Sequence, residues 1–258
     1  MRQNVPDTLT IIPARMAATR LPGKPLRLIG AKPMIVQVWQ RAMMADIGRV
    51  IVACDGDEIA EAIHAEGGEA VITDPALPSG SDRVAAALAI IDPKKTISKV
   101  INLQGDLPEM RPEMLAALAQ AMALSDAEVI TPVAPLKREE VALDQVVKAV
   151  VSWPEEDGVG IGLAHYFSRA AIPFGGRCDQ ESGEAARMWH HVGVYGWQRA
   201  ALDQFVKLRP SPLEKAEKLE PLRALEAGMQ IAAIAVDNAI TGIDTESDLN
   251  AATQRITS

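Results

Sequence analysis

The side chains with the most evident chemistry gather near the start of the chain. Residues 8–45 contain six basic residues and no Asp or Glu, although 34 acids in 258 residues would place about five there on average. Guanidinium and ammonium groups bind phosphate oxygens, while the prolines and Gly23 of residues 20–25 stiffen a loop that a ligand can approach closely. The segment is therefore a candidate polyphosphate-binding loop, although a solvated basic loop would have the same composition. The basic residues are Arg15, Arg20, Lys24, Arg27, Lys32 and Arg41.

The composition of the whole chain narrows the class of protein. With 26 basic and 34 acidic residues, the net charge of −8 argues against nucleic acid or an anionic membrane as the main partner. Cys54 and Cys178 lie too far apart for a zinc motif or a disulfide framework, which indicates a reducing compartment. No apolar run reaches the ~18 residues that a membrane helix needs. We expect a soluble, cytoplasmic protein with residues 1–258 in one domain.

The first half of the chain alternates short apolar runs with helical patterns. Such alternation predicts an α/β fold with a mostly parallel central sheet flanked by helices, whose ligands bind beyond the carboxyl ends of the strands. The predicted strands are 9–12, 50–54, 70–72 and 100–103, and the predicted helices are 34–45, 58–66, 82–91 and 112–124.

The second half is less regular. We predict strands at 146–153, 163–167 and 191–197, and a helix running from the capping box of Ser211 and Glu214 toward Gly228. Thr245 and Asp248 give a weaker capping signal for a last helix.

Three patterns suggest other chemistry and fail on spacing. The glycines at 158, 160 and 162 resemble a dinucleotide fingerprint, but Leu163 stands where the third glycine belongs. Gly23-Lys24 resembles a P-loop, but Pro25 replaces the residue that would hold magnesium. His190 and His191 are adjacent, so on a strand they would point to opposite faces and not share a metal ion.

Residues 12–26, IPARMAATRLPGKPL, resemble the signature of the sugar-activating nucleotidyltransferases, and more narrowly that of the 3-deoxy-manno-octulosonate (Kdo) cytidylyltransferases. Each further motif is weak alone, but together they occur in order along nearly the whole chain, which makes the resemblance strong. The likeness continues through PMIV (33–36), SGSDR (79–83), NLQGD (102–106), YFSRA (166–170), HVGVY (191–195), EKLE (217–220) and GIDT (242–245).

The resemblance implies transfer of CMP from CTP to Kdo, with magnesium as cofactor, on a Rossmann-like nucleotidyltransferase fold. It further implies a homodimer formed with a smaller lobe at about residues 150–200. By resemblance the catalytic residues are Arg15, Lys24 and Asp106, and the metal ligands are Asp106 and Asp244. The implied nucleotide-binding residues are Pro13, Ala14, Arg15, Arg20, Lys24, Ser79 and Gly80. The implied sugar-binding residues are Arg83, Gln104, His191, Tyr195 and Glu220.

Two positions depart from the family pattern. Leu107 stands where relatives often carry Glu, and Pro221 stands where they usually carry Gln. A proline within the predicted helix should kink it and bias Glu220 away from the α region. A related sugar acid, such as 8-amino-Kdo or a sialic acid, therefore remains an alternative acceptor. A nucleotide-binding regulator without catalysis is a further alternative, against which the retention of both Asp106 and Asp244 argues.

Overall fold

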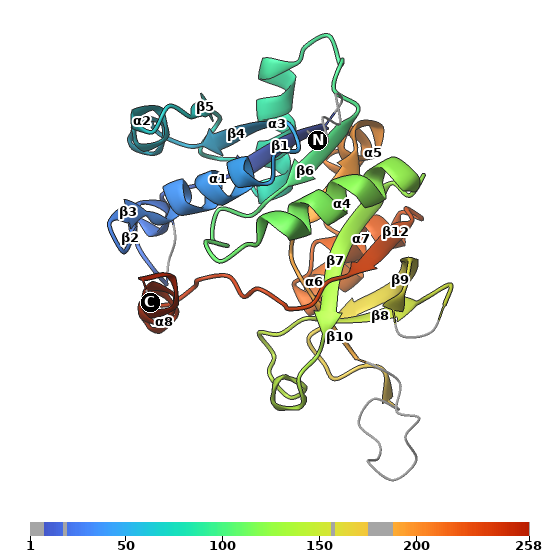
Figure 1. Ribbon diagram of the computed structural model, residues 1–258. Coiled ribbons are helices and arrows are strands. Elements are labelled where there is room, and N and C mark those ends of the chain that lie inside the picture. Colours follow the sequence, from blue (N-terminus) through green and yellow to red (C-terminus); the bar gives the residue numbers. More distant parts are fainter. Residues whose placement is uncertain (1–7, 18–19, 156–157, 175–187, 258) are drawn as a thin grey trace. The chain divides into compact units, whose positions relative to one another are not determined.

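The computed structural model describes residues 8–17, 20–155, 158–174 and 188–257. Contacts within the chain divide it into two compact units (Figure 1). The first unit runs to Ala119 and resumes at Ile240, and the second extends from Gln120 to Ala239. Within the described residues, no helix has the length and apolar character required to cross a membrane. The predicted single-domain organisation and the dimerisation role of residues 150–200 stay predictions.

The first unit contains the regular α/β arrangement. Four strands lie in the order β6-β1-β4-β5, and the neighbouring strands in this order are parallel. Helices α1 and α2 pack against β4 and against each other, and α3 packs against β1 and β4. All these elements lie within two residues of their predicted bounds. They are β1 (Thr8–Pro13), α1 (Met34–Met44), β4 (Arg49–Cys54), α2 (Asp57–Ala65), β5 (Glu69–Ile72), α3 (Gly80–Ile91) and β6 (Lys99–Asn102).

The path of the chain through these strands creates a crevice between β1 and β6. From β1 the chain moves outward to β4 and β5, and it then returns to β6 on the other side of β1. Because the crossovers in parallel sheets are right-handed, this reversal places α3 on the opposite face from α1 and α2. The two helix layers therefore separate at the carboxyl ends of β1 and β6, where open parallel sheets bind their ligands.

The basic loop is held by a small cluster of its own beside the C-terminal segment. Gly23 has a φ of +64° and precedes the short 3-10 helix η1 (Lys24–Leu26), which is followed by the hairpin β2 (Leu28–Ile29) and β3 (Lys32–Pro33). Helix α8 (Glu246–Thr257) packs against β2 (Figure 1). The cluster that joins them fixes the distance between the loop and the start of α8. Its buried members are Leu21, Ile29, Met34, Ile243, Leu249 and Ala252.

The predicted cap of the last helix is confirmed. The Asp248 N–H donates to Thr245 Oγ1 at 3.2 Å, and the Thr245 N–H donates to Asp248 Oδ2 at 2.8 Å. The Asp244 N–H also donates to Asp248 Oδ2, at 3.1 Å. These bonds satisfy amides that a helix start otherwise leaves unpaired, and they fix the segment that carries Asp244.

The second unit has a sheet in the order β10-β8-β9-β12-β7-β11, in which β12 and β7 are parallel and the other pairs are antiparallel. Strands β7 and β12 and helix α5 were not predicted. The strands are β7 (Val129–Pro135), β8 (Lys148–Ser152), β9 (Ile161–Ser168), β10 (Trp189–His191), β11 (Tyr195–Gln198) and β12 (Ile231–Ala235). The helices are η2 (Arg138–Glu140), α5 (Arg199–Phe205), α6 (Pro212–Glu217) and α7 (Pro221–Glu226). Helix α4 (Pro112–Leu124) has the predicted bounds, and the boundary between the units falls within it.

Two elements predicted for the second unit, a strand and a helix, differ from the structure. The single strand expected at 191–197 is two strands, β10 and β11, because residues 192–194 interrupt it. The capping box of Ser211 is present, but the helix it opens ends where Lys218 adopts a left-handed conformation. Pro221 begins a new helix, where its missing N–H costs nothing, and Glu220 has α-helical angles of −57° and −38°. The expected kink and the expected bias of Glu220 away from the α region are therefore both incorrect.

Gly158 and Gly160 lie in the connection between β8 and β9, and Gly162 lies within β9, so none of the three stands between a strand and a helix. Gly158 has a φ of +82°, and a Cβ there would lie 2.5 Å from the ring of Trp189. The positive φ and the close packing therefore account for a glycine at position 158, and no bound dinucleotide is needed to explain it.

We predict that Gly105→Ala destabilises the protein. A Cβ at this position would lie 2.8 Å from the Pro13 carbonyl oxygen and 3.2 Å from Ile35 Cδ1, so the ends of β1 and β6 would have to separate. The free energy of unfolding, measured in urea, should fall by about 1–3 kcal/mol. Gly193→Ala is the matched control, because nothing lies within 4 Å of its added Cβ. Equal losses in the two variants would contradict this explanation.

Candidate functional site

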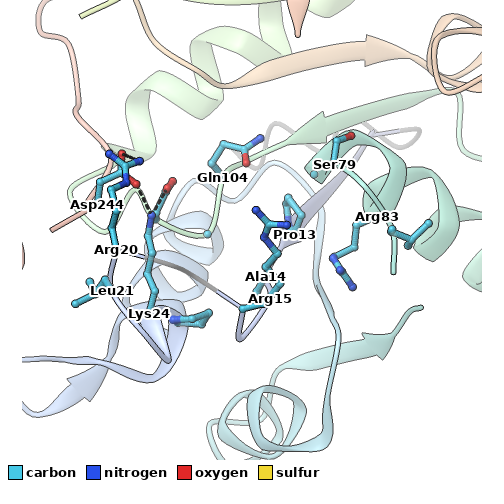
Figure 2. Close-up of a pocket in the computed structure, with 16 residues that line it drawn as sticks. Pro13, Ala14, Arg15, Arg20, Leu21, Lys24, Ser79, Arg83, Gln104 and Asp244 are labelled. Carbon is cyan, nitrogen blue, oxygen red and sulfur yellow. Dashed lines mark hydrogen bonds and ion pairs between the residues drawn. The ribbon is translucent and has the colours of Figure 1, made fainter. Parts of the chain in front are cut away.

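A pocket of about 380 Å³ lies in the first unit, beyond the carboxyl ends of β1 and β6 and beside the start of α3 (Figure 2). Its lining brings together every residue predicted to bind nucleotide, both predicted metal ligands and two of the five predicted sugar-binding residues. The nucleotide-binding set is Pro13, Ala14, Arg15, Arg20, Lys24, Ser79 and Gly80. The metal ligands are Asp106 and Asp244, and the two sugar-binding residues are Arg83 and Gln104. The structure thus places these residues around one space, and their individual roles stay predictions.

The first residues after β1 are anchored to the end of β4. The Ala14 N–H donates to the Ala53 carbonyl at 2.8 Å, which extends the parallel ladder by one residue. The Met16 N–H then donates to both carboxylate oxygens of Asp55, at 3.0 and 3.2 Å. Arg15 is therefore held between two fixed amides at the rim of the pocket. Asp55 was not among the predicted site residues, although its position directly after a predicted strand was a usable signal.

Lys24 joins the two carboxylates predicted to bind metal. Its Nζ lies 2.7 Å from Asp106 Oδ2 and 3.1 Å from Asp244 Oδ1. The Arg20 Nη2 lies 2.9 Å from the other oxygen of Asp244, and these contacts are the dashed lines of Figure 2. The Ile243 N–H donates to the Asp106 carbonyl at 3.0 Å, which ties the two acidic segments together through the backbone as well.

The donor set of this carboxylate pair fits a hard divalent cation only in part. Two carboxylates supply oxygen ligands, but the described residues contain no group of three or more His, Cys, Asp or Glu side chains that could hold a metal ion. Magnesium commonly takes one or two carboxylates and completes its shell with water and substrate phosphates. Asp106 and Asp244 therefore fit magnesium in combination with a phosphate ligand.

Arg83 is a buried cation on the wall of the pocket. Only 2% of its surface is exposed, and its Nη1 donates to Thr73 Oγ1 at 2.6 Å. Its Nη2 is buried and has no hydrogen-bond partner among the described residues. A buried donor without a partner is costly, so this nitrogen is suited to an anionic or polar ligand group. Helix α3 holds Arg83 in place, and its first turn is capped by Ser79, whose Oγ accepts from the Asp82 N–H at 3.2 Å.

Gln104 is oriented by a buried polar chain. Its Nε2 donates to Asn102 Oδ1 at 3.1 Å, and Asn102 Nδ2 donates to Ser81 Oγ at 3.3 Å. Asn102 and Ser81 are both buried, whereas the Gln104 side chain reaches the pocket (Figure 2). Asn102 was not among the predicted site residues, because the sequence marks it only as the end of a strand.

The other three predicted sugar-binding residues belong to the second unit. The His191 Nε2 lies 3.0 Å from Thr131 Oγ1, and its ring centroid lies 5.5 Å from that of Tyr195, although the two residues occupy separate strands. Tyr195 and Glu220 line one small apolar hollow together with Pro221. Burial raises the pKa of Tyr195, so its hydroxyl remains protonated at neutral pH. Their role toward a sugar stays a prediction.

The chain is similar to known proteins in both sequence and structure. A family model described as "Cytidylyltransferase" matches residues 9–231. The chain is 50% identical over 247 residues to a 3-deoxy-manno-octulosonate cytidylyltransferase of Rhodopseudomonas palustris (strain BisB5), with 96% of each chain covered. It is 49% identical to the enzyme of that name from Parvibaculum lavamentivorans, with 95% of this chain and 90% of the relative covered.

Solved structures give a corresponding result. A CMP:2-keto-3-deoxy-manno-octonic acid synthetase in complex with CTP superposes with a TM-score of 0.85 at 35% identity, covering 97% of this chain and 98% of that one. A nucleotidyl transferase from Methanothermobacter thermautotroptrophicus has a TM-score of 0.60 at 14% identity, covering 98% of both chains, and supports the fold alone. The predicted α/β nucleotidyltransferase fold is thereby confirmed.

We predict that His191 makes stability depend on pH. Burial, with a smaller contribution from His190, lowers the pKa of His191 from 6.5 to about 3. At pH 5 the unfolded chain therefore binds a proton that the folded chain excludes, so this contribution is complete above pH 6.5 and is lost as the pH falls toward 3. Between pH 7 and pH 5, the free energy of unfolding should fall by about 2 kcal/mol more in the wild type than in His191→Gln.

Urea unfolding at the two pH values measures this difference. The matched control is His64→Gln, which removes an exposed histidine and should keep the pH dependence of the wild type. A His191→Gln variant that loses as much stability as the wild type would show that the residue is not held neutral.

Proposed function

This chain belongs to the cytidylyltransferase family, and from that membership we infer that it is a nucleotidyltransferase that transfers CMP from CTP to Kdo. The products are CMP-Kdo and pyrophosphate. The observation that carries this conclusion is the 50% identity, over 96% of the chain, to a 3-deoxy-manno-octulosonate cytidylyltransferase. The 35% identity to a structure complexed with CTP supports the same nucleotide.

In the reaction, the anomeric hydroxyl of Kdo attacks the α-phosphorus of CTP. An oxygen–phosphorus bond forms, the bond from the α-phosphorus to the bridging oxygen breaks, and pyrophosphate leaves as the hydroxyl loses its proton. We propose that Arg15, Arg20 and Lys24 hold the triphosphate and neutralise the charge that grows on the departing pyrophosphate. Their convergence on one pocket supports this assignment.

We assign magnesium to Asp106 and Asp244, with triphosphate oxygens completing its coordination. When bound, the ion supplies neutralisation of phosphate charge. Asp106 is positioned for this role by the end of β6, and Asp244 by the capped start of α8.

We propose that the cytosine of CTP and the Kdo sugar contact different walls of the pocket. Ser79 and Gly80, which line the pocket at the start of α3, would lie near the cytosine. Arg83 would bind the Kdo carboxylate through its unpaired Nη2, and Gln104 would bind a sugar hydroxyl. His191, Tyr195 and Glu220 complete the proposed sugar set.

The finer biological setting is also a proposal. We place the enzyme in the cytoplasm of a bacterium that makes lipopolysaccharide, where it would act as a homodimer assembled through residues 150–200. The charge of −8 supports small-molecule substrates over nucleic acid.

The activity is tested by incubating the protein with CTP, magnesium and Kdo and measuring pyrophosphate. Parallel reactions with ATP, GTP and UTP, and with 8-amino-Kdo and a sialic acid, define the specificity. We expect the fastest release with CTP and Kdo. Release at the rate of the enzyme-free control in every reaction would reject catalysis, and faster release with another sugar acid would reassign the acceptor.

We predict that Asp106→Asn lowers kcat by about 100-fold or more while the protein remains folded. The amide keeps the shape of the side chain but removes the charge that the proposed metal site requires. Steady-state pyrophosphate release at saturating magnesium measures the effect. The control is Glu109→Gln, a nearby acid that pairs with Arg255, and it should keep kcat within about twofold. A near-normal kcat for Asp106→Asn would contradict the assignment.

We predict that Arg83→Met raises the KM for Kdo by about 10-fold or more, the usual effect of losing a charged hydrogen bond to a ligand. The KM for CTP should change little. The exposed Arg111, replaced in Arg111→Met, controls for loss of a positive charge. An increase confined to the KM for CTP would move Arg83 from the sugar to the nucleotide.

A further inference from the structure

The two acids at the proposed metal site already carry a cation of the chain itself. The Nζ of Lys24 lies within 3.1 Å of one oxygen of Asp106 and one of Asp244. In the proposed function, Lys24 also binds the triphosphate. The same ammonium group therefore has two competing sets of partners, the carboxylates and the phosphates.

The position of Lys24 is built into the fold. Its side chain is only 15% exposed, and it projects from η1, whose Arg27 N–H donates to the Lys24 carbonyl and whose Pro25 is buried. Arg20 differs, because its side chain is 67% exposed and reaches only the outer oxygen of Asp244. Of the two cations, Lys24 is the one that lies between the carboxylates.

A divalent ion that bound both carboxylates would lie close to this ammonium, and like charges at short range repel. The ion would also find only two protein carboxylates there, with no third acidic, histidine or cysteine ligand among the described residues. Both obstacles disappear when a triphosphate is present, because it attracts the ammonium and supplies further oxygens.

We propose that Lys24 is an internal counter-ion that keeps Asp106 and Asp244 from binding a divalent cation until the nucleotide arrives. The triphosphate would draw the ammonium away from the carboxylates, which would leave Asp106 and Asp244 free to hold the metal. Metal and nucleotide therefore bind cooperatively, and neither binds well alone. This inference rests on the proposed function for the metal site at Asp106 and Asp244 and for the triphosphate as the ligand of Lys24.

The test measures metal affinity and not turnover. Mn²⁺ replaces Mg²⁺, and its free concentration is followed by electron paramagnetic resonance, with and without α,β-methylene-CTP, which cannot release pyrophosphate. We expect weak Mn²⁺ binding by the nucleotide-free wild type and binding at least about 10-fold tighter with the analogue, after correction for Mn²⁺ held by free analogue. Such coupling is typical between linked sites.

Lys24→Met should bind Mn²⁺ about 10-fold more tightly than the wild type without nucleotide, and the gain from the analogue should shrink. Lys24→Gln repeats the loss of charge with a polar side chain, should one variant fold poorly. Lys24→Arg retains the charge and should keep weak nucleotide-free binding. Lys32→Met is the matched control for losing a lysine charge, and its effect should stay below about threefold because Lys32 pairs with Glu66 and does not line the pocket.

Three results would overturn the proposal. They are equal nucleotide-free affinities for the wild type and both neutral Lys24 variants, an equal gain in Lys32→Met, or a gain that persists in Lys24→Met/Asp106→Asn, which would place the ion elsewhere. The wild type's pyrophosphate release from CTP and Kdo is measured on the same preparation. An inactive wild type would count against the proposed function, whereas an active wild type with unchanged Mn²⁺ affinities would count against the counter-ion alone.

Discussion

Two carboxylates that face each other need a cation between them, and the pocket of the first unit is organised around this requirement. Asp106 and Asp244 are separated by 138 positions (244 − 106), so only the fold can bring them together. The parallel sheet delivers Asp106 at the end of β6, while the cluster of Leu21, Ile243 and their neighbours delivers Asp244 beside the basic loop. The same cluster fixes the loop that carries Lys24. The packing of apolar side chains therefore determines where the Lys24 ammonium meets the two carboxylates.

The remaining groups of the pocket follow from strand order. Because the order reverses between β1 and β6, the loops after these two strands face an opening that no crossover helix covers. A loop that leaves a sheet is free to move unless its amides are bound, and Asp55 binds the Met16 N–H just beyond the end of the ladder. Asn102 has the corresponding function for Gln104. Both residues therefore act on the site through groups that line it.

The strands and helices of the first unit are predicted better than those of the second, because local sequence patterns mark them more clearly. Strands and helices with a local periodic pattern, from β1 to β6, are predicted to within two residues. Strand β12 was missed although it is a short apolar run, because three of its five residues are alanine, which is depleted in strands. The break between His191 and Tyr195 is set by contacts that Thr131 makes with the carbonyls of residues 192 and 194. Composition revealed the basic loop, but the pairing of Asp106 with Asp244 came only from family resemblance.

The balance of charge in the pocket explains why a protein of net charge −8 concentrates cations here. Four basic side chains (Arg15, Arg20, Lys24 and Arg83) and two acidic ones (Asp106 and Asp244) line it, a balance of 4 − 2 = +2. A nucleoside triphosphate carries about −4 at neutral pH and a magnesium ion +2, so the pocket with both ligands is close to neutral. With the nucleotide alone it would be negative, and with the metal alone strongly positive. Charge balance in a partly enclosed site thus favours the two ligands together, which is the same coupling that the contacts of Lys24 produce locally.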